Sequence, residues 1–404
     1  MPGCAKKFSC RPPEVHHGRG KMKIKPILKT TGSTLALCAA VIVGTARTAV
    51  AEEEFTVTML SVSVYGPWFI AKENGMADGV DINVKIIEDI TARNAGLVSG
   101  SIQCMMTTMD STVVTAAADV PVKHVAVPLM SYGLDEMVVD GAIQSEADLA
   151  GKTYAADYGF LNHMWMLLTL KKNGIPFDGA THSIMLPQDA TAAFSSGALD
   201  VDVNFIPFST QSAERQGAHV LKSTFTDKTY ERGLVSDSIA CSTNWLEEKP
   251  EVAREVIRAW FEAVDWWKQN PAEGNAIIAK GLDWPEEDVR LTQAGAVMLT
   301  IDQNKGALGL GDGKPLCESI PTEAPQPDGE PSGWGALVGK DVDCEAGYLA
   351  DTWDLFSNVY HEAGVADATI SADDGIDPSI IEWLDSEGYD ETYSNNNWVG
   401  RLPI

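Results

Sequence analysis

A short polar loop opens an apolar helix in the middle of the chain, and its side chains could bind a small molecule. The segment reads "DYGFLNHMWMLLTLKKNGI" and begins with Asp157, Tyr158, Phe160, Asn162 and His163. The first turn of a helix offers unpaired backbone N–H groups and the positive end of the helix dipole. Such a helix start can hold a small molecule when the rest of the fold places other groups around it.

Strand-like and helix-like segments alternate along the chain, which predicts an α/β fold with largely parallel sheets. The expected strands read "EFTVTML", "INVKIIE", "CMMTTMD", "VKHVAVPL", "KTYAAD", "THSIMLP" and "LDVDVNFIPF". A long helix is expected before Asn270, with an apolar stripe at Val252, Val256, Trp260, Val264 and Trp267.

A chain of 404 residues, 45% of them hydrophobic, is long enough for two lobes. We expect residues 52–140 and 235–300 to form lobe one and residues 141–234 to form lobe two. Residues 301–404 are expected to be a C-terminal extension with a disulfide-bonded loop.

The N-terminus has the features of an export signal. Lys23, Lys25 and Lys29 form a basic region, a short apolar run follows, and Ala49-Val50-Ala51 is a cleavage site of the A-x-A type. The apolar run is shorter than a membrane span of about 18 residues, so a membrane anchor is not expected. We therefore predict that residues 1–51 are a cleaved signal peptide with an over-called start upstream, and that the mature protein is periplasmic.

Charge and cysteine content restrict the possible partners. The formal net charge of −27 argues against binding to nucleic acid or to anionic membranes, which requires clustered Lys and Arg. In an oxidising compartment Cys317 and Cys344 form a plausible disulfide around a Pro- and Gly-rich loop. Metal binding is the alternative, but no CxxC or HExxH spacing occurs, and no metal or cofactor is expected. Cys104 lies in an apolar stretch and is expected to be a buried thiol.

The order of several motifs resembles one known family, the periplasmic solute-binding proteins of ABC importers for nitrate, sulfonates, taurine and thiamine-pyrimidine precursors. The motifs that carry the resemblance are "YGPWFIAKENGMADGVDINVKI", "GLVSGSIQCMMTT", "DLAGKTYAADYGFLNHMWMLLTLKKNGI", "LPQDATAAFSSGALDVDVNF" and "STNWLEEKPEVAREVIRAWFEAVDW". The resemblance implies a type II periplasmic-binding-protein fold, with two α/β lobes, a two-segment hinge and a ligand cleft between the lobes. It also implies an ABC permease and ATPase as partners of a monomeric binding protein.

In that fold the ligand lies beyond the carboxyl ends of the strands, and closure of the lobes buries it. By analogy, five loop segments reach the cleft. The candidate ligand-binding residues in them are Tyr65, Trp68, Arg93, Thr108, Asp110, Ser111, Asp157, Tyr158, Phe160, Asn162, His163, Asn204 and Phe208. Core packing is the competing explanation for Trp68, and helix capping competes for Asp110 and His163.

These residues bring aromatic rings and two carboxylates to the cleft but only one cation, Arg93. Aromatic walls with carboxylates favour a neutral or cationic nitrogen compound, such as a pyrimidine or an amine. A sulfonate, taurine or nitrate is the alternative, held by backbone N–H groups and hydroxyls. An enzyme related to thiamine-pyrimidine synthases is the alternative of another class, but the cysteine-rich iron motif of those enzymes is missing. Transport and sensing use the same closure of lobes, and the sequence does not separate them.

Overall fold

The structure is a computed structural model that describes residues 52–131, 133–224, 227, 236–315 and 346–397. The predicted signal peptide and the predicted Cys317–Cys344 disulfide lie outside these residues. Among the described helices, none combines the length and the apolar character that a membrane span requires.

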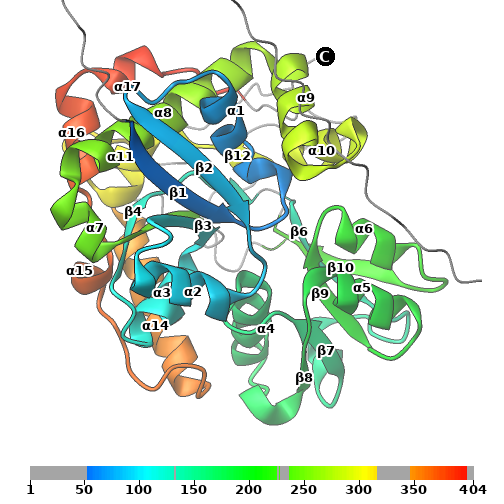
Figure 1. Cartoon of the computed structure of the whole chain (residues 1–404). Helices are drawn as coiled ribbons and strands as arrows, with labels where there is room; N and C mark the ends of the chain where they lie inside the picture. The colour runs from blue at the N-terminus through cyan, green and yellow to red at the C-terminus, as the bar shows by residue number, and fades with distance from the viewer. Residues whose placement is uncertain (1–51, 132, 225–226, 228–235, 316–345, 398–404) are drawn as a thin grey trace, which may run out of the picture. The chain divides into compact units, whose positions relative to one another are not determined.

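Two five-stranded mixed sheets form the framework (Figure 1). The first sheet has the order β2-β1-β3-β11-β4, in which β11 runs antiparallel to both of its neighbours and the β1 pairings are parallel. Its strands are β1 (Glu53–Met59), β2 (Val80–Ile86), β3 (Cys104–Thr108), β4 (Val122–Ala126) and β11 (Asp237–Ser242).

The second sheet repeats this arrangement with the order β10-β6-β9-β7-β8. Strand β6 is antiparallel to its neighbours β9 and β10, whereas β7 pairs in parallel with β8 and β9. Its strands are β6 (Asp135–Val139), β7 (Thr153–Ala156), β8 (Thr181–Ile184), β9 (Val201–Phe205) and β10 (His219–Ser223). A separate two-stranded ladder joins β5 (Leu129–Ser131) to β12 (Ala296–Met298). These sheets confirm the predicted two-lobed α/β fold.

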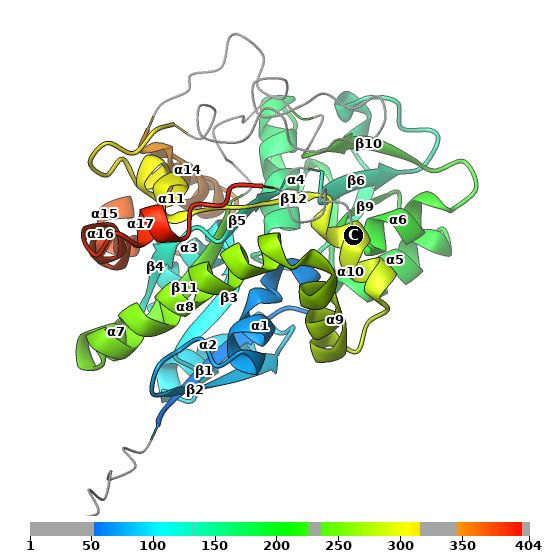
Figure 2. The same ribbon diagram turned by 90° about the horizontal axis from the view of Figure 1, so that it is seen from above.

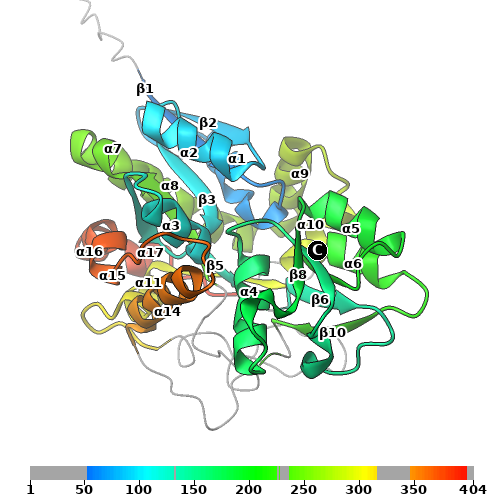
Figure 3. The same ribbon diagram turned by 90° about the horizontal axis from the view of Figure 1, so that it is seen from below.

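Helices cover both sheets. In the second lobe α4 packs on one side of the sheet and α5 with α6 on the other (Figures 2 and 3). The helices of the first part of the chain are η1 (Ser63–Tyr65), α1 (Pro67–Glu73), α2 (Ile90–Ser99), α3 (Met109–Ala117), η2 (Glu146–Leu149), α4 (Leu161–Lys172), η3 (Phe177–Gly179), α5 (Pro187–Ser195) and α6 (Phe208–Ala213). The later helices are α7 (Thr243–Glu248), α8 (Pro250–Gln269), α9 (Pro271–Leu282), α10 (Glu286–Gln293), α11 (Ile301–Leu308), α14 (Tyr348–Glu362), α15 (Ala372–Gly375), α16 (Ser379–Ser386) and α17 (Tyr389–Thr392).

The predicted apolar stripe of the long helix is confirmed in α8. Val256, Trp260, Val264 and Trp267 are buried there, and the Trp260 ring lies 5.2 Å from that of Trp68. The stripe joins a core that also takes in the C-terminal helices α14 and α16. Burial of such a stripe is what stabilises a helix of this length against the sheet.

The chain passes between the sheets twice. It leaves the first lobe after β5 and enters the second sheet at Asp135, and it returns to the first sheet at Asp237. Strand β6 therefore belongs to the second sheet, although it lies upstream of the boundary at residue 140 that the sequence predicted. Both crossings begin a strand with an aspartate, which brings two carboxylates to the junction of the lobes.

The expectation that Cys104 is a free buried thiol is wrong. Cys104 on β3 and Cys241 on β11 form a disulfide, and the antiparallel register places the two residues directly opposite each other. Their separation of 137 residues hides the pairing from any local pattern. The return of the chain to the first sheet is what brings the two sulfurs together.

Removing this disulfide should lower stability while leaving the fold intact. We expect the double variant Cys104→Ala with Cys241→Ala to lose about 2–4 kcal/mol of unfolding free energy, because the cross-link restricts a long loop of the unfolded chain. Urea denaturation with and without reductant measures the effect. The two midpoints should differ without reductant and coincide with it, because reductant breaks the predicted Cys317–Cys344 disulfide in both proteins. Equal midpoints without reductant would contradict this expectation.

Candidate functional site

The carboxyl ends of the parallel strands in the two sheets carry most of the predicted ligand residues. Tyr65 follows β1, Arg93 lies on α2 after β2, and Asp110 opens α3 directly after β3. In the second lobe Asp157 follows β7 and Asn162 lies in the first turn of α4. In open α/β sheets this edge is where ligands bind.

Arg93 is fully buried and lacks hydrogen-bond partners. Its side chain has 0% exposure, and all three guanidinium nitrogens are without a partner among the described residues. Burial lowers the pKa of Arg93, while Tyr65, Asp157 and Glu88 favour its charged form. A buried guanidinium with free donors is costly in a folded protein. Such a group is suited to bind a hydrogen-bond acceptor on a ligand.

Three aspartates from different elements are buried close together. Asp110 comes from α3, Asp135 from the start of β6 and Asp237 from the start of β11, with exposures of 0%, 4% and 5%. Tyr65 donates a hydrogen bond to the Asp237 carboxylate. Asp110 Oδ1 has no partner among the described residues.

Burial raises the pKa of each of these carboxyl groups. Desolvation raises the pKa of Asp110 to about 6 and that of Asp135 to about 7. The pKa of Asp237 is raised well above its usual range by burial and then by the neighbouring Asp135. A positively charged or N–H-rich ligand would favour the ionised forms, because it would replace the missing water with charge and donors.

Residues of lobe two contact the first lobe next to Asp110. Ser111 Oγ donates to the Gly159 carbonyl oxygen at 2.8 Å, which links α3 to the loop before α4. Asn162 Nδ2 donates to the Val203 carbonyl oxygen at 2.6 Å, while its Oδ1 has no partner among the described residues. Asp157 is half-buried, and burial raises its pKa to about 6 although Arg93 acts in the opposite direction. Phe160 packs into the core of the first lobe.

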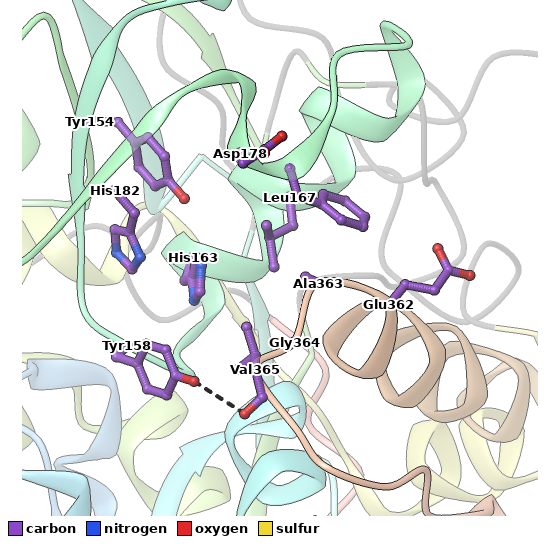
Figure 4. Close-up of a pocket in the computed structure, with 11 residues that line it drawn as sticks. Tyr154, Tyr158, His163, Leu167, Asp178, His182, Glu362, Ala363, Gly364 and Val365 are labelled. Carbon is purple, nitrogen blue, oxygen red and sulfur yellow. Dashed lines mark hydrogen bonds between the residues drawn. The ribbon is translucent and has the colours of Figure 1, made fainter.

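Two predicted residues line an open pocket beside the cluster. Tyr158 and His163 face a pocket of about 480 Å³ between lobe two and the end of α14 (Figure 4). The His163 ring lies 4.1 Å from that of His182, which stacks on Tyr154 at 4.8 Å. Burial and the neighbouring His182 lower the pKa of His163 to about 3, so this imidazole is neutral near pH 7.

Other predicted residues have structural roles. Trp68 packs between Phe55 and Trp260 in the core of lobe one. Asn204 Nδ2 donates to the Pro187 carbonyl oxygen at 2.9 Å, within lobe two. Phe208 meets Phe205 edge to face. Thr108 Oγ1 donates to Ser111 Oγ at 3.1 Å and so supports the interlobe contact indirectly.

Sequence reasoning missed Asp135, Asp237 and Tyr360. The two aspartates each precede an apolar strand at a crossing between the lobes, as "DEMVV" and "DSIACS", and this position is a signal that could have identified them. Tyr360 lies in the C-terminal extension, and its hydroxyl donates to Asp110 Oδ2 at 2.5 Å. No local pattern marks it, since the contact spans 250 residues. In the described part of the chain, no group of three His, Cys, Asp or Glu could hold a metal ion.

Comparison with known proteins identifies the family. A model of the NMT1/THI5-like family matches residues 63–274, so the chain belongs to this family. No curated protein matches the sequence.

Solved structures with the same fold are similar to the chain at low sequence identity. The periplasmic aliphatic sulphonate binding protein SsuA from Escherichia coli has a TM-score of 0.56 at 17% identity, over 81% of this chain and 92% of that chain. The periplasmic nitrate-binding protein NrtA from Synechocystis PCC 6803 has a TM-score of 0.59 at 15% identity, over 85% of this chain and 91% of that chain. DSZB in complex with biphenyl-2-sulfinic acid has a TM-score of 0.51 at 11% identity, over 83% and 99%. These likenesses establish the fold, which two kinds of periplasmic binding protein share.

Proposed function

We propose that the protein is the solute-binding component of an ABC importer and that it binds a small nitrogen-containing solute between its lobes. It is exported to the periplasm as a monomer, closes around the solute and delivers it to a membrane permease with its ATPase. The solute carries N–H donors or a positive charge for the carboxylates and an acceptor for Arg93. An aminopyrimidine has both groups, N–H donors and ring-nitrogen acceptors, and an amine must carry an acceptor elsewhere in the molecule.

The observation that carries the proposal is the cluster of three buried carboxyl groups, Asp110, Asp135 and Asp237. The buried guanidinium of Arg93 interacts with Tyr65, which is the donor to Asp237. An anion in this cluster would be repelled by each ionised carboxylate, and the repulsion grows as water is excluded. The family and the likeness to SsuA and NrtA support a binding protein.

Arg93 favours a second candidate, an anionic solute such as a sulfonate, taurine or nitrate. Its three nitrogens without partners could hold a sulfonate or nitrate oxygen. The names of SsuA and NrtA state such ligands for those proteins. In this case the carboxyl groups would be protonated in the complex, as their raised pKa values would allow.

A thermal-shift screen of the exported protein tests both candidates. The panel contains pyrimidines, amines, taurine, alkanesulfonates and nitrate. A ligand at about 100 times its dissociation constant adds roughly 2.7 kcal/mol to the stability and raises the melting temperature. A pyrimidine or amine hit that is lost in Asp110→Asn supports the proposal. A sulfonate or nitrate hit that survives in Asp110→Asn contradicts the proposed ligand class.

The likeness to DSZB keeps an enzyme as the alternative of another class, since DSZB shares its fold with the periplasmic binding proteins SsuA and NrtA. Incubation of each screened compound with the protein, followed by mass spectrometry of the mixture, distinguishes the two. A binding protein returns every compound unchanged, whereas the appearance of a product would support an enzyme.

Asp157 is the residue of lobe two whose removal should weaken binding without unfolding the protein. We expect Asp157→Ala to weaken a pyrimidine or amine hit about tenfold or more, since a hydrogen bond to a charged group contributes about 1.5–3 kcal/mol. Titration calorimetry measures the affinity, and the melting temperature should change little. Asp178→Ala, in the outer pocket of the same lobe, is the control. Equal affinities for the wild type and Asp157→Ala would remove Asp157 from the site.

A further inference from the structure

Helix α14 of the C-terminal extension contacts both lobes. It packs against α3 of the first lobe and also against α4 of the second (Figure 3). The polypeptide crossings before β6 and β11 are therefore not the sole connection between the lobes. A helix that bridges two lobes at their junction can influence the groups buried there.

Tyr360 is the buried residue of this bridge. Its hydroxyl donates to Asp110 Oδ2 at 2.5 Å and lies 3.4 Å from the Phe160 carbonyl oxygen. Asp110 belongs to the first lobe and Phe160 to the second, so one hydroxyl reaches both lobes. The side chain has 0% exposure, and water does not compete for these contacts.

The other side of the Asp110 carboxylate is free. Oδ2 accepts from Tyr360, whereas Oδ1 has no partner among the described residues. A carboxylate held through one oxygen presents the other oxygen in a fixed direction. Such a preorganised oxygen can accept a hydrogen bond from a ligand.

Two outer contacts of α14 accompany this inner one. The Tyr158 hydroxyl donates to the Val365 carbonyl oxygen at 3.1 Å, at the edge of the pocket in Figure 4. Lys171 pairs with Glu362 at 2.5 Å, but both side chains are about half exposed, and such pairs contribute little. We therefore expect loss of the buried Tyr360 contact to have the largest effect on the groups between the lobes.

We propose that Tyr360 is a positioning residue of the ligand site: it holds Asp110 so that Oδ1 faces the solute, and it makes the C-terminal helix α14 part of the binding unit. The ligand side of this inference rests on the proposed function. The positioning of Asp110 does not, because it can be measured in the ligand-free protein.

The groups around Asp110 determine whether removal of the Tyr360 hydroxyl raises or lowers the pKa of Asp110. Asp135 on β6 and Asp237 on β11 face it from the crossings, and Tyr65 bonds to Asp237 on the far side. His163 on α4, 6.2 Å from the Tyr360 ring, is neutral. Tyr360 on α14, Thr108 at the end of β3 and the backbone N–H groups of Asp110 and Ser111 favour the ionised form of Asp110. Loss of the Tyr360 donor removes stabilisation of the ionised form, so the pKa of Asp110 should rise.

The test compares Tyr360→Phe with a matched control, Tyr348→Phe. Both substitutions remove one buried hydroxyl from α14, but the Tyr348 hydroxyl contacts Ser236 and Met130 instead of Asp110. The carboxyl carbons of aspartate are labelled with ¹³C, and the Asp110 signal is assigned by its loss in Asp110→Asn. A pH titration by NMR then follows this one carboxyl group in the ligand-free protein.

We expect the Asp110 signal to titrate near pH 6 in the wild type and in Tyr348→Phe. In Tyr360→Phe the midpoint should rise by about one pH unit. An unchanged midpoint in Tyr360→Phe, or an equal rise in both variants, would overturn the positioning role.

A binding measurement with 4-aminopyrimidine as the probe tests the ligand side. At pH 7 the affinity should fall about tenfold in Tyr360→Phe and stay unchanged in Tyr348→Phe. Equal affinities in all three proteins would contradict the inference. If the probe binds none of them, the proposed ligand class is contradicted, and the NMR titration alone decides on Tyr360.

Discussion

Arg93→Met is expected to stabilise the ligand-free protein and to abolish solute binding. The guanidinium is fully buried, and its three nitrogens lack hydrogen-bond partners among the described residues. Replacing it by an unbranched apolar side chain removes a desolvated charge, and we expect a gain of about 1–3 kcal/mol in unfolding free energy. The lost attraction to Glu88 and Asp157 is smaller, because both of these carboxylates are partly exposed and screened by water.

The same substitution should remove the donors that a bound solute needs. Truncating one partner of a buried charged contact usually costs about 2–5 kcal/mol of binding free energy. The thermal shift caused by any hit of the screen should therefore vanish in Arg93→Met. Loss of binding together with a higher melting temperature separates a ligand-binding arginine from a structural one.

Arg258→Met is the matched control for the stability measurement. Arg258 is also largely buried, at 8% exposure, but it has a full set of acceptors. These acceptors are Glu255, Glu262, the Tyr393 hydroxyl and the Met76 carbonyl oxygen. We expect Arg258→Met to lower the unfolding free energy, opposite in sign to Arg93→Met. A loss of stability of similar size in both variants would show that Arg93 has a structural role.

Asp135→Asn is expected to stabilise the protein at pH 8 but not at pH 4. Burial raises the pKa of Asp135 from 3.8 to about 7 in the folded state. Between these two values the folded protein binds more protons than the unfolded chain, so stability falls as pH rises through this window. Asparagine does not ionise, so the stability of Asp135→Asn does not fall in this pH window for this reason. The difference between variant and wild type should be near zero at pH 4 and approach about 4 kcal/mol at pH 8.

Urea denaturation of both proteins at pH 4, 6 and 8 measures this difference. Asp81→Asn, an exposed carboxyl group on β2, is the control and should alter stability little at any of these pH values. The same Asp135→Asn variant should bind an amine or pyrimidine hit more weakly at pH 8, since it lacks one of the three buried carboxylates. A variant that is equally stable relative to wild type at pH 4 and pH 8 would contradict the raised pKa.

Local patterns in the sequence predicted β1 to β4, β7 to β9 and the long helix α8, but not β6 or β11. The apolar stripe of α8 was visible because Val256, Trp260, Val264 and Trp267 recur at helical spacing. The end of α1 also has a local signal, because the glycine that follows it, Gly75, adopts a left-handed conformation with a φ of +62°. Alternation of strands and helices, and the order of motifs, were enough to predict two lobes.

The candidate site was predicted only in part. Arg93, Asp110 and Asp157 were proposed from the sequence because they follow the ends of β2, β3 and β7, and ligands bind at this edge of open α/β sheets. Trp68 lies at the same edge but turns into the core, and spacing cannot tell these two directions apart. Asp135 and Asp237 were missed because they begin strands, and only the crossing of the chain between the lobes carries them to the site.

The sequence by itself determined most of the strands and the long helix, because burial of an apolar face leaves a local period in the chain. It also determined the family, because the motifs keep their order along the chain. Only the tertiary structure decided that Cys104 pairs with Cys241, that Asp135 and Asp237 lie beside Asp110, and that Tyr360 reaches Asp110. These contacts join residues more than 100 positions apart or lie at chain crossings, so nothing in the neighbouring sequence reports them. Strand register and the packing of the lobes determine which residues meet in these contacts.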